Sequence, residues 1–307
     1  MRTKDLFYFM ELLIQTQRSE QRFGTAHVYQ STLNRIRKYE RSNRMPFSKL
    51  TREWLKGFET QLRFEQLKEN TISTYLRMLK AVYNQAVDNG LVVYIPRLFK
   101  HVHTGIDAKH DRSLEPEVLQ KLIAPSRLLR GDLEATRSIF LLLLMLQGMP
   151  FVDLVHLRKC DLKNGVIVYR RQKTGSELRV TVDPEAMDII EKYRSVNSDS
   201  PYLFPFITDS GREGYRQYQN ALREFNQSLA FLSSLLGLNT GLSSYKARHT
   251  WASLANFLGF DKKLISECMG HSSLKITETY FKAQGDTRIK KVNQGVISYL
   301  ISSFKSC

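Results

Sequence analysis

A helical periodicity through the first third of the chain is the feature that most constrains its fold. From Asp5 to about Tyr94, apolar residues recur at spacings of three and four, which is the spacing of one face of an α-helix. Polar breaks near residues 18–24, 41–48 and 69–70 interrupt the pattern. The sequence therefore predicts four helices in this region.

The rest of the chain predicts a mixed domain. The stretch Leu133–Leu146 predicts a helix that is almost wholly apolar on its later turns and belongs in a core. Two short segments, Val166–Tyr169 and Leu178–Val182, have the composition of β-strands, and Lys173 lies in the turn between them. From Tyr215 onward the pattern is helical again. The predicted fold class is mainly α with a small β-sheet, as an N-terminal helical domain and a C-terminal mixed α/β domain.

The predicted domain boundaries follow from length and composition. A chain of 307 residues suggests two domains of roughly 150 residues each. Residues 96–111 combine Pro, Gly and three histidines with little periodicity, which is typical of a linker. We expect a helical domain over 1–95, this linker, a second domain over 112–283 and an amphipathic tail helix over 284–307. The linker histidines, which match no familiar metal-ligand spacing, are His101, His103 and His110.

The charge balance favours a polyanionic partner. Lys and Arg number 46 against 30 acidic residues, giving a net charge of +16 and a pI of about 9.7. The longest apolar run, Ile139–Leu146, is far short of the roughly 20 residues that span a bilayer, so nucleic acid is favoured over membrane. No secretory signal is evident, and the three cysteines include no CxxC pair. We expect a cytoplasmic protein with reduced thiols and neither a metal nor another cofactor.

Basic residues on the predicted N-terminal helices are candidates for DNA contacts. They can form a phosphate-contacting surface or a solvated helix face, and the global charge favours the first. The candidates are Arg35, Arg37, Lys38, Arg41, Arg44, Arg77 and Lys80.

The segment from Ser243 to Tyr280 contains several polar residues of types that can take part in catalysis. Ser243 or Ser244 can cap a helix that carries Arg248 in its first turns. His271 directly follows Gly270, a residue suited to ending a helix, and Tyr280 comes nine residues later. This spacing allows the three side chains to share one site.

These segments resemble a known family. The stretches Ala247–Thr250, Gly270–Ser273 and Thr277–Tyr280 are similar in order and spacing to the C-terminal signature of tyrosine recombinases and phage integrases. The N-terminal helices resemble the core-binding domain of the same family, so the resemblance covers nearly the whole chain. The segment Gly148–Leu154 is similar to integrases carried by mobile elements of Bacteroides-like bacteria. The resemblance implies a clamp around double-stranded DNA that contains a specific site.

The chemistry of a phosphodiester fits these residue types. Attack on phosphorus builds negative charge on the nonbridging oxygens, which the planar donor fork of Arg248 can neutralise. His271 would donate to such an oxygen or help to take the tyrosine proton, and Tyr280 would supply the attacking oxygen. Lys173 would protonate the departing 5′ oxygen. The resemblance implies the same roles, with a 3′-phosphotyrosyl intermediate and no nucleotide cofactor.

The sequence departs from the family pattern at two places. Most relatives have a further arginine where this chain has Pro150, and the similar subgroup has it where this chain has Gln147, whose carboxamide carries no charge. Arg137 and Arg158 are candidates to supply the missing cation. Tyr245 stands where many members have a histidine and can still donate a hydrogen bond to phosphate.

The function expected is that of a site-specific DNA recombinase, an integrase or invertase, acting as a homotetramer on DNA. The family packs its tail helix into a neighbouring protomer, although packing on its own domain is equally consistent with the sequence. One alternative is a weakened or inactive site-specific DNA-binding protein, because Gln147 and Pro150 replace the first catalytic arginine. Another is a relaxing topoisomerase without site preference.

Overall fold

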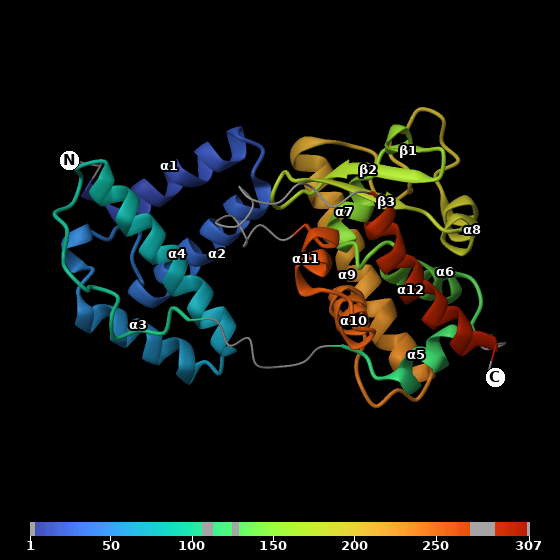
Figure 1. Cartoon of the computed structure of the whole chain (residues 1–307). Helices are drawn as coiled ribbons and strands as arrows, with labels where there is room; N and C mark the ends of the chain where they lie inside the picture. The colour runs from blue at the N-terminus through green and yellow to red at the C-terminus, as the bar shows by residue number, and fades with distance from the viewer. Residues whose placement is uncertain (1–3, 106–112, 125–128, 271–285, 306–307) are drawn as a thin grey trace. The chain divides into compact units, whose positions relative to one another are not determined.

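The computed structural model divides the chain into two compact units, Met1–His110 and Asp111–Cys307. It describes residues 4–105, 113–124, 129–270 and 286–305 (Figure 1). The predicted fold class is confirmed, because the elements are mainly helical with one small sheet.

The first unit is built from the four predicted helices. Asp5 caps the first of them by accepting a hydrogen bond from the Tyr8 backbone N–H at 2.9 Å. The helices bury a shared apolar core, and the chain after them continues into it: Leu98 and Phe99, within the segment expected as a linker, are 4% and 7% exposed. The described part of that segment is therefore packed, because its apolar residues cover the core. The helices are α1 (Leu6–Ser19), α2 (Phe23–Glu40), α3 (Arg52–Phe64) and α4 (Glu69–Asp88).

The second unit places a three-stranded antiparallel sheet beside a helical core. The strand order is β1-β2-β3, and Ile167 pairs with Val180 in the central ladder. Neither β1 nor α8 was expected from the sequence. The elements are α5 (Pro116–Ile123), α6 (Asp132–Met145), α7 (Phe151–His156), β1 (Leu162–Lys163), β2 (Val166–Arg170), β3 (Glu177–Thr181), α8 (Pro184–Tyr193), α9 (Gly211–Leu235), α10 (Ser244–Phe257), α11 (Lys262–Cys268) and α12 (Asp286–Lys305).

Helix α6 lies at the centre of the second unit. Its apolar turns are buried throughout, as the sequence predicts, and α8, α9 and α10 pack against it. Helix α12 packs beside α10 and α5 (Figure 1), where Val292, Val296 and Ile297 are at most 3% exposed. Within the described part of the chain, no helix combines the length and apolarity needed to cross a bilayer.

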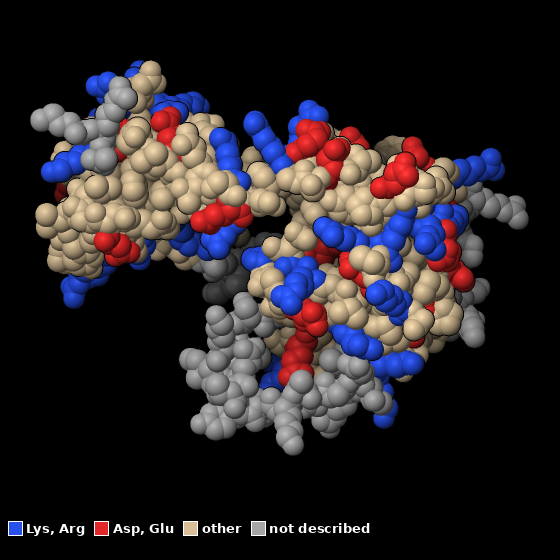
Figure 2. All heavy atoms as spheres, turned by 90° about the horizontal axis from the view of Figure 1, so that it is seen from above, with Lys and Arg blue, Asp and Glu red and all other residues tan. Residues whose placement is uncertain are grey.

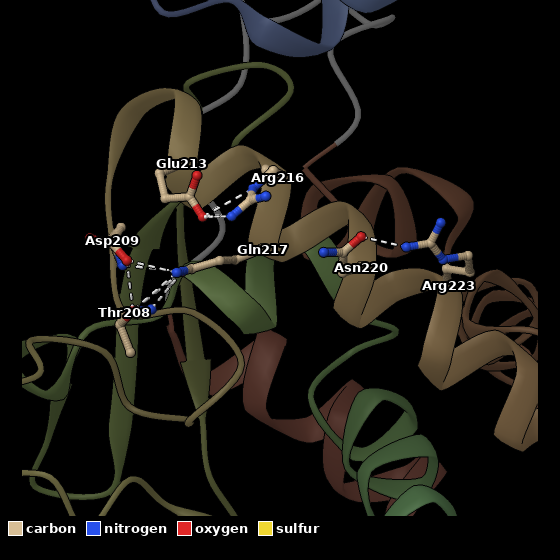
Figure 3. Close-up of polar contacts among 7 residues, drawn as sticks. All are labelled: Thr208, Asp209, Glu213, Arg216, Gln217, Asn220 and Arg223. Atoms are coloured by element: carbon tan, nitrogen blue, oxygen red, sulfur yellow. Dashed lines mark hydrogen bonds and ion pairs between the residues drawn. The ribbon is translucent and has the colours of Figure 1, made fainter.

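Helix α9 supports the elements on which the site is built. The Gln217 carboxamide fixes its N-terminal half by hydrogen bonds to Thr208 and Asp209, as Figure 3 shows. Further along α9, the Phe225 ring stacks on Phe151 of α7, with centroids 4.5 Å apart. Asn226 accepts a hydrogen bond from the Ser244 backbone N–H at the start of α10. Helix α9 therefore holds both α7 and α10 in place.

Candidate active site

Strand β2 brings an arginine into the interior of the second unit. Side chains alternate along a strand, and Ile167 and Tyr169 face the core while Val168 and Arg170 face solvent. The next residue, Arg171, continues the inward face and is 7% exposed. The alternation of β2 thus buries a guanidinium at the base of the predicted Lys173 hairpin.

Arg171 connects three separate segments. Its Nε donates to the Asp153 Oδ2 on α7 at 3.4 Å, and its Nη1 donates to the backbone oxygens of Met269 and Gly270 at 3.1 and 2.8 Å. The other Asp153 oxygen accepts from the Gln172 backbone N–H at 2.9 Å. Asp153 therefore joins the hairpin base to α7, and Arg171 joins both to the C-terminus of α11.

Arg248 reaches the same carbonyl from α10. It is 4% exposed, and it donates to the Met269 oxygen at 2.5 Å and to the Gly148 oxygen at 3.1 Å. Gly148 has φ +64, and a Cβ there would lie 2.9 Å from the Arg248 Cα, so glycine permits α10 to approach the turn after α6. Because arginine has five N–H donors, these two bonds leave donors for phosphate oxygens.

The cluster has an excess of buried positive charge. Burial, reinforced by the neighbouring Arg171 guanidinium, lowers the pKa of Arg248 to about 10. Burial also raises the pKa of Asp153, although the Gln172 N–H and Arg171 act in the opposite direction. Even with Asp153 ionised, the described residues of the cluster comprise two guanidiniums and one carboxylate. Such a cluster suits an anionic ligand.

Gln147 lies in the turn after α6 and directly precedes Gly148, whose carbonyl oxygen accepts from Arg248. It is 3% exposed, its φ of +59 is left-handed, and its Nε2 has no hydrogen-bond partner within the described ranges. Arg137, one of the two candidates for the missing cation, bonds elsewhere. It caps α5 instead, donating to the Ala124 oxygen at 2.9 Å and pairing with Glu134. Arg158 is exposed in a loop after α7.

The other predicted catalytic residues occupy more open positions or lie outside the described residues. Lys173 is exposed in the tight turn between β2 and β3, where the Gly175 N–H donates to the Arg171 oxygen at 2.8 Å. Tyr245 is 52% exposed in the first turn of α10, and its ring meets His249 edge-on at 5.0 Å. His271 and Tyr280 belong to the residues that the structure does not describe, so their placement stays a prediction.

The predicted DNA-contacting residues of the first unit fall into two groups. Arg35 and Lys38 share the carboxylate of Glu65, and Arg37 pairs with Glu11 at 2.5 Å. The remaining candidates are exposed: Arg41, Arg44, Arg77 and Lys80. On the face drawn in Figure 2, Lys and Arg side chains are interspersed with Asp and Glu over each unit. Three of the predicted DNA-contacting residues, Arg35, Arg37 and Lys38, are therefore paired with carboxylates of their own unit.

Comparison with known proteins decides the family. Residues 5–101 match the phage integrase SAM-like domain, and residues 112–286 match the domain described as phage integrase family. The chain belongs to the phage integrase family. It is 27% identical over 267 residues to tyrosine recombinase XerA of Thermococcus kodakarensis, covering 75% of this chain and 90% of that protein.

Two solved structures share the fold of this phage integrase family member. The Tn1549 transposon integrase, in complex with transposon right end DNA, matches with a TM-score of 0.61 and 16% identity, covering 94% of this chain and 99% of that one. A lambda integrase tetramer bound to a Holliday junction matches with a TM-score of 0.60 and 14% identity, covering 91% and 80%. At such identities, the similarity establishes the fold.

Sequence reasoning about this phage integrase did not identify Arg171 and Asp153 as part of the site. The alternation of β2 was the available signal, because Ile167 and Tyr169 predict that Arg171 also points inward. Asp153 gave no comparable signal, since its partners are 18 and 19 residues further along the chain.

Proposed function

We propose that the chain is a site-specific DNA recombinase that cleaves and rejoins strands through a 3′-phosphotyrosyl intermediate. The observation that carries the proposal is the buried cluster in which Arg171 and Arg248 converge on the Met269 oxygen with Asp153 as the described carboxylate. Its excess positive charge fits the phosphate of a strand being cleaved. Membership in the phage integrase family agrees with this chemistry.

The proposed reaction exchanges one phosphodiester for another. The Tyr280 oxygen forms a bond to phosphorus while the bond from phosphorus to the 5′ oxygen breaks. Arg248 neutralises charge on the nonbridging oxygens, and His271 donates to one of them or accepts the phenol proton. Lys173 gives a proton to the departing 5′ oxygen. Attack by the 5′ hydroxyl of another strand reverses these steps, so the bond energy is retained and no nucleotide cofactor is consumed.

The assembly and biological setting are part of the proposal. We propose a cytoplasmic integrase or invertase of a mobile element that acts as a homotetramer on DNA. The lambda integrase tetramer on a Holliday junction supports the tetramer, because the two proteins share a fold. We also propose helical, catalytic and tail segments at 1–95, 112–283 and 284–307, with DNA contacts from the exposed basic residues of the first unit.

A covalent-capture experiment tests the function. The DNA site is first selected from random duplexes by mobility shift with the full chain, and the selected duplex is then nicked near its centre so that the cleaved end diffuses away. We expect a protein–DNA adduct that survives denaturant and disappears in Tyr280→Phe while the mobility shift remains. An adduct that persists in Tyr280→Phe would refute the proposal.

The same experiment separates the second candidate function. Gln147 is neutral and buried at the position where the similar subgroup has an arginine, which favours a weakened or inactive DNA-binding protein. Such a protein would shift the selected duplex and form no adduct. A topoisomerase would instead relax supercoiled plasmid that lacks the selected sequence.

A further inference from the structure

The Arg171 side chain hydrogen-bonds to two segments outside its own hairpin, α7 and the end of α11. Its side chain bonds to Asp153 and to two consecutive carbonyls at the end of α11. Its backbone also closes the hairpin, since the Arg171 N–H donates to the Ser176 oxygen at 2.9 Å and its oxygen accepts from Gly175. One residue thus fixes both the base of the turn and the direction from which the turn leaves the sheet.

The hairpin base is tied to the arginine cluster while its tip stays open. Gln172, between Arg171 and Lys173, is held through its backbone N–H by Asp153. Lys173 itself is exposed. A lysine with four side-chain carbons reaches one phosphate oxygen reproducibly only when its backbone is fixed. The bonds around Arg171 supply that restraint one and two residues before Lys173.

Close packing makes the arrangement sensitive to the shape of Arg171. Gly270 has φ +60, and a Cβ there would lie 2.9 Å from the Arg171 Cδ and 2.9 Å from a Leu178 methyl group. The guanidinium lies against the α11 turn with little spare volume. Lysine at this position has one terminal nitrogen, whereas Arg171 addresses a carboxylate and two carbonyls with a planar fork.

We infer that Arg171 is a positioning residue that, together with Asp153, fixes the Lys173 hairpin relative to Arg248. This inference rests on the proposed function, because it assigns Arg171 to the delivery of the leaving-group proton. It acts through Lys173 and does not itself touch the reacting atoms. Arg171 and Arg248 both donate to the Met269 oxygen. This shared acceptor holds the base of the hairpin at a fixed distance from Arg248.

A change of leaving group tests this role. Cleavage is measured on the nicked selected duplex with the ordinary 5′ oxygen and with sulfur at that bridging position. A thiolate leaves without a proton, so the sulfur substrate does not need Lys173. We expect Arg171→Lys to slow cleavage of the oxygen substrate on the order of 10²-fold, the scale of a catalytic group displaced by about 1 Å. The sulfur substrate should lose less than about threefold, a small part of that effect.

Two further variants keep the test decisive. Arg170→Lys is the matched control, because Arg170 is the neighbouring arginine of β2 and its side chain is 75% exposed. It should cleave both substrates like the unchanged protein. In the unchanged protein the two Asp153 oxygens accept separately from the Arg171 Nε and the Gln172 N–H. Asp153→Asn keeps only one accepting oxygen and should reproduce the Arg171→Lys pattern. It carries the same test if Arg171→Lys does not fold.

The outcomes separate this inference from the function on which it rests. Equal losses on both substrates, or no loss on either, would overturn the positioning role while the unchanged protein still forms its adduct. If the unchanged protein forms no adduct with the oxygen substrate and none with the sulfur substrate, the proposed function is overturned, and the inference with it.

Discussion

Replacing Gln147 with arginine is the most informative perturbation of the site. Gln147 is 3% exposed, its Nε2 has no partner among the described residues, and the next residue supplies the carbonyl that accepts from Arg248. An arginine here would add a third buried guanidinium, one residue before the carbonyl that accepts from Arg248. The predicted effects on catalysis and on stability have opposite signs.

The two magnitudes follow from the surroundings. A preorganised donor to the transition state is typically worth 10²- to 10³-fold, so Gln147→Arg should raise cleavage on the order of 10²-fold. Overpacking a buried position costs roughly 1–3 kcal/mol. For a unit of this size, that corresponds to a Tm lower by roughly 2–12 °C. Repulsion among three buried cations adds to this loss, and bound DNA should offset it.

The assay pairs single-turnover covalent capture with thermal unfolding, each with and without the selected duplex. Gln147→Met is the matched control, since it keeps a flexible chain of similar size and removes the unpartnered donor. It should unfold at the same or a higher temperature and gain no activity. A Gln147→Arg protein that cleaves no faster would show that Gln147 lies outside the active site, and the charge argument would fail.

Three further predictions concern other regions. Glu65→Gln should release Arg35 and Lys38 and so tighten DNA binding. The slope of log K against log salt concentration should steepen by roughly 0.9 for each added phosphate contact. Glu20→Gln is the control, and weaker DNA binding by Glu65→Gln would exclude this surface from the DNA contact. Burial raises the pKa of Cys268 to about 12, so iodoacetamide at pH 8 should label the exposed Cys160 and spare Cys268 until the protein unfolds. The raised pKa means that the contribution of Cys268 to stability is complete below its ordinary pKa and is lost as pH rises toward 12; labelling of native Cys268 at pH 8 would contradict its burial. Truncation after Gln284 removes Val292, Val296 and Ile297 from the core, each contributing about 1.5–3 kcal/mol to the free energy of unfolding, and should lower the urea midpoint markedly. Unchanged stability would contradict the packing of α12 on its own unit. Full tetramer assembly on DNA without the tail would rule out exchange of the tail between protomers.

The sequence by itself determined most of the long helices, the main hairpin and the residue types that carry the chemistry, but not β1 or α8. Helical periodicity predicted α1 to α4, the apolar stretch predicted the buried α6, and β-forming residues around a turn predicted the hairpin of β2 and β3. Gly270 follows the end of α11, as the sequence predicted, and has a φ of +60. These features are visible in sequence because they depend on neighbours within a few residues.

Only the tertiary structure decided which side chains meet. Arg171 bonds to carbonyls 98 and 99 residues away, and Arg248 bonds to one that precedes it by 100 residues. Strand alternation indicates that Arg171 points inward, yet the identity of its partners depends on how α7, α10 and α11 pack around the sheet. The same packing assigned Arg137 to the end of α5 and buried Gln147 with its Nε2 unpaired among the described residues. Local periodicity carries no information on such long-range pairings, because they are selected by the volume and hydrogen-bonding needs of the assembled core.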